Sequence, residues 1–94
     1  MKRLTLRTKC TLAEAKALAS IVSIAERAQQ RYGDFASTHE ALGVALEEWH
    51  ELIEAIKSND LPWIRAEAID LAAVIIRLAC QCEDSDAFKN RSTK

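Results

Sequence analysis

Four carboxylates lie at mirror positions about one short turn in this chain of 94 residues. The first pair is Glu48 and Glu51, the second is Glu67 and Asp70, and both mirror pairs are centred on the turn. Residues 58–62 read Ser-Asn-Asp-Leu-Pro, which predicts a turn followed by a helix that begins at a proline. Antiparallel helices joined there would place Glu51 opposite Glu67 and Glu48 opposite Asp70. Each pair would lie about 12–16 Å from the turn, at about 1.5 Å per residue.

These acids predict a site for divalent cations. Residues three apart on a helix are neighbours, with Cβ atoms about 5–6 Å apart, so four negative groups gather in one patch. Bound cations would relieve their repulsion. Ligands that are all oxygen favour Mg²⁺, or Mn²⁺ as a substitute, over zinc. Because Mg²⁺ in proteins commonly bridges to phosphates, a polyphosphate substrate is the natural inference, with metal-activated water as the attacking group.

A solvated glutamate face is the alternative interpretation of the same residues. It explains Glu54 well and Glu47 fairly well, but it explains Glu67 and Asp70 poorly, because their helix is otherwise almost entirely apolar. Arg77 falls on the same side of that helix as Asp70, two turns further on. It could contact a phosphate or pair with Asp70, and the sequence favours neither.

Composition and charge set the class of protein. Two glycines, one proline and 5% aromatic residues indicate an all-α domain. The basic residues of the two ends enclose a body, residues 11–88, that carries all 14 acidic residues and six basic ones. This acidic body makes nucleic acid an unlikely partner. An odd number of cysteines, three, suggests reduced thiols in a cytoplasmic protein, and no apolar run approaches the eighteen residues that span a membrane.

Three helices are predicted within residues 11–83, between a basic arm (1–10) and a C-terminal tail (84–94) in which Phe88 could dock on the bundle. Two Ser/Thr-x-x-Glu capping boxes open the first two helices, which should end near residues 31 and 57. The second helix carries a coiled-coil-like apolar stripe, formed by Leu42, Leu46, Trp49, Ile53 and Ile56.

The third helix, from Pro62 to about Glu83, is expected to pack on the alanine-rich flank of the second, beside Glu48, because small side chains allow close approach. It is apolar nearly all round, and Cys80 is expected in its core-facing part. Three helices of this length would cover it poorly. The expected fold is therefore an antiparallel three-helix bundle completed by homo-oligomerisation, as a dimer or tetramer.

Two short motifs in this order resemble the MazG-like nucleoside triphosphate pyrophosphohydrolases. They are Glu48-Trp-His-Glu51 and Glu67-Ala-Ile-Asp70, and the preceding Glu47 completes the frequent EExxE form. Residues 26–35, Glu-Arg-Ala-Gln-Gln-Arg-Tyr-Gly-Asp-Phe, and residues 66–77 are similar to the first and third helices of small phage- and mobile-element-type members. The superfamily also includes dimeric dUTPases and phosphoribosyl-ATP pyrophosphohydrolase.

The resemblance implies Mg²⁺-dependent hydrolysis of a nucleoside triphosphate to the monophosphate and pyrophosphate, in the role of clearing unwanted nucleotides. It implies metal ligation by Glu48, Glu51, Glu67 and Asp70, with Glu47 and Glu48 as catalytic acids. Candidate substrate-binding residues are Arg77 and, at the end of the first helix, Gln29, Gln30 and Arg31. From its place beside Pro62, Trp63 could stack on a nucleobase, although docking within the bundle is the favoured interpretation. Two alternatives stay open, which are a dUTPase-like or phosphoribosyl-ATP-like specificity and a catalytically silent helical module that serves assembly or regulation.

Overall fold

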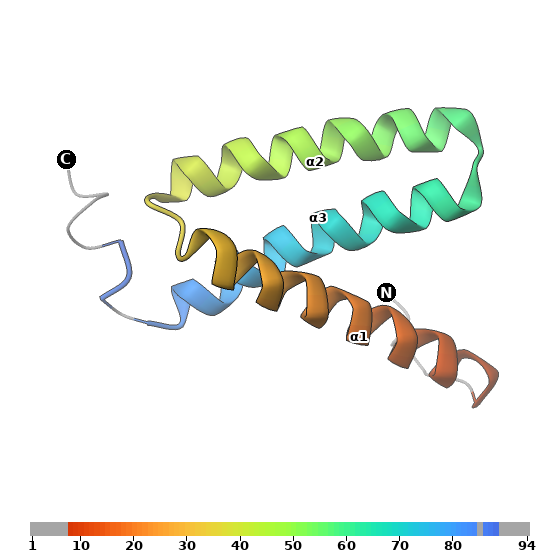
Figure 1. Ribbon diagram of the computed structural model, residues 1–94, viewed down its shortest axis with the longest axis horizontal. Coiled ribbons are helices and arrows are strands. Elements are labelled where there is room, and N and C mark those ends of the chain that lie inside the picture. The colour runs from red at the N-terminus through yellow and green to blue at the C-terminus, as the bar shows by residue number, and fades with distance from the viewer. Residues whose placement is uncertain (1–7, 85, 89–94) are drawn as a thin grey trace, which may run out of the picture.

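A computed structural model describes residues 8–84 and 86–88 as an antiparallel arrangement of three α-helices. They are α1 (Thr8–Tyr32), α2 (Thr38–Ser58) and α3 (Leu61–Cys82). Helices α2 and α3 form a hairpin, and α1 crosses α3 (Figure 1). Helix α3 packs against both others, whereas α1 and α2 make no helix–helix contact within this part of the chain. The all-α bundle predicted from the sequence is confirmed.

The connections begin and end where capping residues require. Gly33 follows α1 with a φ of +73°, a left-handed conformation that costs glycine little, and its N–H donates to the carbonyl of Gln29. The hydroxyl of Ser37 accepts from the N–H of Glu40 at 3.1 Å, as the second capping box predicts. Between α2 and α3, Asn59 is left-handed at φ 61° and Asp60 caps α3 by accepting from the N–H of Trp63. These caps set the register of the α2–α3 hairpin.

The first helix begins earlier than its capping box predicts. Helix α1 starts at Thr8, so Thr11 lies within the helix rather than before it, and residues 8–10 of the predicted arm belong to α1. Residues 1–7 of that arm and residues 85 and 89–94 of the predicted tail lie outside the described part of the chain.

The contact between α2 and α3 is made by small side chains. Ala41 and Ala55 of α2 are completely buried, and Ala73 of α3 is 2% exposed. At the open end of the hairpin, Phe35 and Phe88 are buried with Ala41 and Val74 in one apolar cluster. The docking of Phe88 that the sequence suggested therefore occurs. As predicted, α3 lies on the alanine-rich flank of α2.

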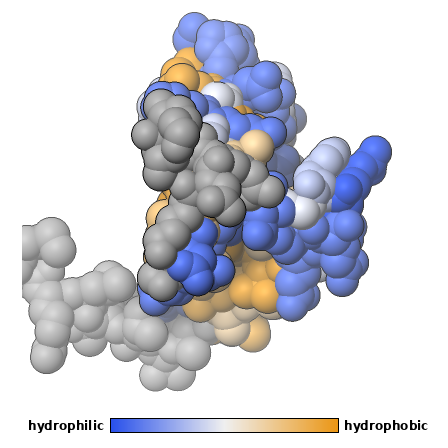
Figure 2. All heavy atoms as spheres, turned by 90° about the vertical axis from the view of Figure 1, so that its left-hand side faces the viewer, coloured by the Kyte–Doolittle hydropathy of each residue, from blue (hydrophilic) through white to orange (hydrophobic). Residues whose placement is uncertain are grey.

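The larger apolar side chains of α2 lie at the surface instead. Leu42 and Leu46 are each 55% exposed, and Trp49 and Ile56 are each 48% exposed. The apolar stripe of α2 therefore does not form the core of the single chain. The expected burial of Cys80 is also wrong, because Cys80 is exposed. Apolar side chains reach the surface among hydrophilic ones in the space-filling view (Figure 2).

None of the helices in the described part of the chain is long and apolar enough to cross a membrane.

We predict that Ala55→Leu lowers the free energy of unfolding by about 1–3 kcal/mol, because the added atoms must be accommodated in a fully packed contact between α2 and α3. Urea denaturation at fixed protein concentration measures the change. Ala79→Leu, at an exposed position of α3, is the matched control and should have little effect. Equal destabilisation by both substitutions would contradict the close α2–α3 contact.

Candidate metal and nucleotide site

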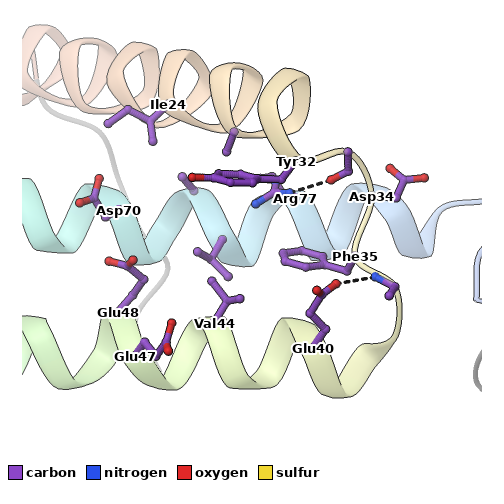
Figure 3. A pocket seen from close by; sticks show the side chains of 15 residues that line it. Ile24, Tyr32, Asp34, Phe35, Glu40, Val44, Glu47, Glu48, Asp70 and Arg77 are labelled. Carbon is purple, nitrogen blue, oxygen red and sulfur yellow. Dashed lines mark hydrogen bonds between the residues drawn. The ribbon is translucent and has the colours of Figure 1, made fainter.

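Three carboxylates converge between α2 and α3. One oxygen each from Glu48, Glu67 and Asp70 lies within 4.8 Å of the other two. Glu48 and Asp70 face each other across the hairpin (Figure 3). The turn at Asn59 sets this register, and the alanine contact brings the two helices close enough for the acids to meet. The mirror spacing in the sequence thus becomes a compact cluster of acids.

Two oxygens in this cluster have no partner. Oε1 of Glu48 and Oε1 of Glu67 are buried and accept no hydrogen bond from the described residues. A buried carboxylate oxygen without a donor is costly, and a cation is the partner that would satisfy it. Oxygen ligands that are close together and carry net negative charge suit a hard divalent cation. The residues present therefore fit a metal ion of this class.

Burial and mutual repulsion also raise the pKa values of the three acids. Burial, followed by repulsion from Glu51, Asp70 and Glu67, raises the pKa of Glu48 from 4.5 to about 7. Burial and repulsion from Asp70 and Glu51 raise the pKa of Glu67, and a hydrogen bond from Trp63 opposes this shift. Burial and repulsion from Glu51 raise the pKa of Asp70. Protons therefore compete with any cation for these oxygens.

Glu51 and Glu47 occupy the margins of the cluster. Glu51 is more exposed and lies outside the group of three, yet it is close enough to repel each of them. Glu47 is exposed and lines the adjoining cavity, pointing toward it from α2 (Figure 3). The structure thus places one predicted metal ligand at the edge of the cluster and the predicted auxiliary acid beside open space.

A cavity of about 600 Å³ adjoins the acids on the side away from the α2–α3 turn. Its volume lies within the range of about 300–1,000 Å³ typical of small-molecule sites. The acids Glu47, Glu48 and Asp70 border one end, and Phe35 and Glu40 border the other. Apolar side chains from all three helices line the middle, namely Ile24, Ala28, Val44, Ala73 and Val74. The cavity therefore combines a negative end with an apolar middle.

Arg77 lies at the far end of this cavity from the acid cluster. Its guanidinium donates to the carbonyl of Gly33 at 2.9 Å and to Oε1 of Gln29 at 3.3 Å, and it lies over the ring of Phe35. Among residues 8–84 and 86–88 no ion pair joins Arg77 to Asp70. Its contacts are thus with the connection between α1 and α2.

The other candidate substrate residues lie apart from the cavity. Gln30 and Arg31 are exposed, and Arg31 lies over the ring of Tyr32. Gln29 bonds to Asp34 and Arg77. Trp63 stands one turn before Glu67 on α3 and is 42% exposed. None of these four lines the cavity, and their roles in substrate binding stay predictions.

Most residues that line the cavity were not predicted as site residues from the sequence, among them Tyr32, Phe35 and Glu40. Tyr32 and Phe35 flank the glycine that ends α1, and Glu40 belongs to the capping box of α2. Each was interpreted only as part of a helix end. An aromatic residue on each side of a glycine stop was the available signal, because such residues can line a cavity where two helices separate.

The structure thus defines an all-α hairpin with three convergent acids beside a cavity. A family model for the MazG nucleotide pyrophosphohydrolase domain matches residues 36–93, and the chain belongs to this family. No match was found among curated proteins or among solved structures. Membership supports nucleotide pyrophosphohydrolase activity in general, and the acid cluster supports the use of a divalent metal.

We predict that, in EDTA, the free energy of unfolding falls as the pH rises from about 4.5 to about 7. The raised pKa of Glu48 means that the folded protein holds a proton over this range that the unfolded chain has released, and the shifts of Glu67 and Asp70 act in the same direction. Urea denaturation across this pH range measures the slope.

Glu48→Gln should flatten the slope, whereas Glu54→Gln, which removes an exposed acid on the same helix, should leave it unchanged. Excess Mg²⁺ should raise stability most at the high end of the range, where the acids are ionised. If Glu48→Gln left the slope unchanged, the pH dependence of stability would not come from the raised pKa of Glu48.

Proposed function

We propose that this protein is a Mg²⁺-dependent nucleoside triphosphate pyrophosphohydrolase that forms the nucleoside monophosphate and pyrophosphate. The observation that carries the proposal is the convergence of Glu48, Glu67 and Asp70, with two unpartnered buried oxygens, at one end of a nucleotide-sized cavity. Membership of the family gives independent support for the reaction class. Clearance of unwanted nucleotides is the role we propose for it.

In this proposal Glu48, Glu51, Glu67 and Asp70 hold the metal. Mg²⁺ bound there would neutralise phosphate charge and lower the pKa of a bound water. Glu47, beside the cavity and free of the crowding around Glu48, accepts the proton of the attacking water. The water oxygen forms a bond to an anhydride phosphorus as the bond between the α- and β-phosphates breaks. The monophosphate and pyrophosphate then leave.

The cavity receives the nucleoside. Its apolar middle suits the faces of a base and a sugar, and burial there removes apolar surface from water. Tyr32, which is 69% exposed and extends across the space between α1 and α3, is positioned to contact the base (Figure 3). The nucleoside would thus lie between α1 and the hairpin with its phosphates directed toward the acids.

We predict that purified protein with Mg²⁺ releases pyrophosphate and monophosphate from at least one nucleotide and that EDTA abolishes the reaction. A panel that includes canonical and modified nucleotides, dUTP and phosphoribosyl-ATP, analysed by ion chromatography, tests the class and distinguishes the specificities. No turnover by folded protein would favour the silent module and contradict our proposal.

Asp70→Asn and Glu48→Gln should each lower kcat by at least about a hundredfold, because each removes a carboxylate from the cation site. They should also remove the rise in melting temperature that Mg²⁺ produces in the wild type. Glu54→Gln is the control, since Glu54 is exposed and pairs with Lys57. An Asp70→Asn variant that still responds to Mg²⁺ would contradict the ligand assignment.

We also propose that the exposed apolar stripe of α2 mediates self-association. Leu42, Leu46, Trp49 and Ile56 are each about half exposed, and Leu18 and Val22 of α1 and Ile75 of α3 add further exposed apolar surface. A stripe of large exposed apolar side chains along one helix is typical of a site of association. A second copy is the partner that the sequence predicts.

Leu46→Glu should convert the assembly to the monomer mass of 10.5 kDa, because a charge in an apolar interface has no partner. Light scattering after size exclusion measures the mass. Lys57→Gln, which makes the same change in net charge at an exposed position of the same helix, should leave the mass unchanged. A wild-type protein that is already monomeric would contradict self-association.

A further inference from the structure

The connection between α1 and α2, residues 33–37, is fastened to the C-terminal half of α3 by side chains. The amide of Gln81 pairs with both backbone groups of Phe35: Oε1 accepts from the Phe35 N–H at 3.0 Å, and Nε2 donates to the Phe35 carbonyl at 3.0 Å. This two-bond pairing fixes the orientation of one loop residue against the helix. It also satisfies two backbone groups that lie on a partly buried surface.

Arg77 fastens the same connection one turn earlier on α3. It donates from Nη2 to the Gly33 carbonyl and from Nε to Gln29, and its guanidinium carbon lies 4.5 Å from the centroid of the Phe35 ring. A planar cation over an aromatic face, with hydrogen bonds along its edge, holds one geometry better than a flexible ammonium would. Together, Arg77 and Gln81 hold Phe35 by its backbone and by its ring.

The fastened segment is a wall of the cavity. Gly33, Asp34, Phe35 and Ala36 line it at the end away from the acids, and Phe35 is 4% exposed. The N–H of Ala36 donates to Glu40, so α2 holds the other end of the segment. Gln81 does not line this cavity, and at about 1.5 Å per residue it lies about 16 Å along α3 from Asp70. Its influence on a ligand there must act through the connection.

We propose that Arg77 and Gln81 are positioning residues for the nucleoside half of the substrate. They keep residues 33–36 in the arrangement that completes the cavity, and they leave the phosphate end to the acids. This inference rests on the proposed function. When a binding-competent arrangement is populated for only a fraction of the time, apparent affinity falls by that fraction, so loosening the wall weakens nucleoside binding without altering the chemistry at the acids.

The test compares the wild type with Gln81→Leu, Arg77→Lys and a control, Cys82→Ala, which changes an exposed residue of the same helix end. For the best nucleotide of the panel we measure kcat, KM and inhibition by the two products, the nucleoside monophosphate and pyrophosphate. Gln81→Leu and Arg77→Lys should raise KM and the monophosphate inhibition constant about tenfold. This corresponds to residues 33–36 holding the arrangement that completes the cavity for about a tenth of the time. The inhibition constant of pyrophosphate and kcat should stay within about twofold. The control should match the wild type.

The outcomes separate this inference from the proposed function. Absence of turnover in the folded wild type contradicts the proposed function, and this inference fails with it. Turnover with an unchanged KM in Gln81→Leu overturns the inference alone. A pyrophosphate inhibition constant that rises in Arg77→Lys overturns it too, because it would place the guanidinium on a phosphate. Gln81→Glu, which keeps the acceptor for the Phe35 N–H and loses the donor, provides the same comparison if Gln81→Leu does not fold.

Discussion

Repulsion among three half-buried carboxylates is the constraint on which the site depends. Glu67 and Asp70 are neighbours on α3, and Glu48 joins them because α2 approaches closely. That approach depends on alanines at positions where larger side chains would separate the helices. The packing of small residues thus holds together groups that repel one another. The raised pKa values and the two unpartnered oxygens are the consequences, and a divalent cation is the ligand that resolves both.

Helix α3 joins the acid cluster to the cavity and to the connection between α1 and α2. Its N-terminal half contributes Glu67 and Asp70, its middle contributes the floor of the cavity, and its C-terminal half holds the α1–α2 connection through Arg77 and Gln81. Helix α1 reaches the cavity by packing on α3, which is the helix that it contacts within the described part of the chain. The geometry of the acid end and that of the wall therefore share one rigid element.

The packing of α2 on α3 through alanines also explains why large apolar side chains lie at the surface. Because α3 packs on the alanine-rich flank of α2, the larger apolar residues of that helix remain exposed. A single chain of this size buries few large side chains, and none is completely buried within the described residues. Association of two copies would remove this apolar surface from water, and that burial would stabilise the assembly.

The number of helices, the caps of α2 and α3 and the register of the acids follow from local features of the amino-acid sequence. Local signals decide these features: Ser37, Gly33 and Asp60 act within a few residues of the backbone groups they satisfy, and the mirror spacing of the four acids follows from the helical repeat. The packing flank of α2 was also predictable, since alanines permit close approach. The start of α1 was not, because a capping box can be overridden by continuation of the helix.

The partners of Arg77, by contrast, depend on how the helices pack together. Because Arg77 lies on the same side of its helix as Asp70, the sequence allowed it to contact a phosphate or to form an ion pair with Asp70. Its actual neighbours, Gly33 and Phe35, lie more than forty residues earlier in the chain. The same is true of the pairing between Gln81 and Phe35 and of the cavity that Tyr32 helps to line. Contacts between distant segments depend on how helices cross, which the periodicity within one helix does not specify.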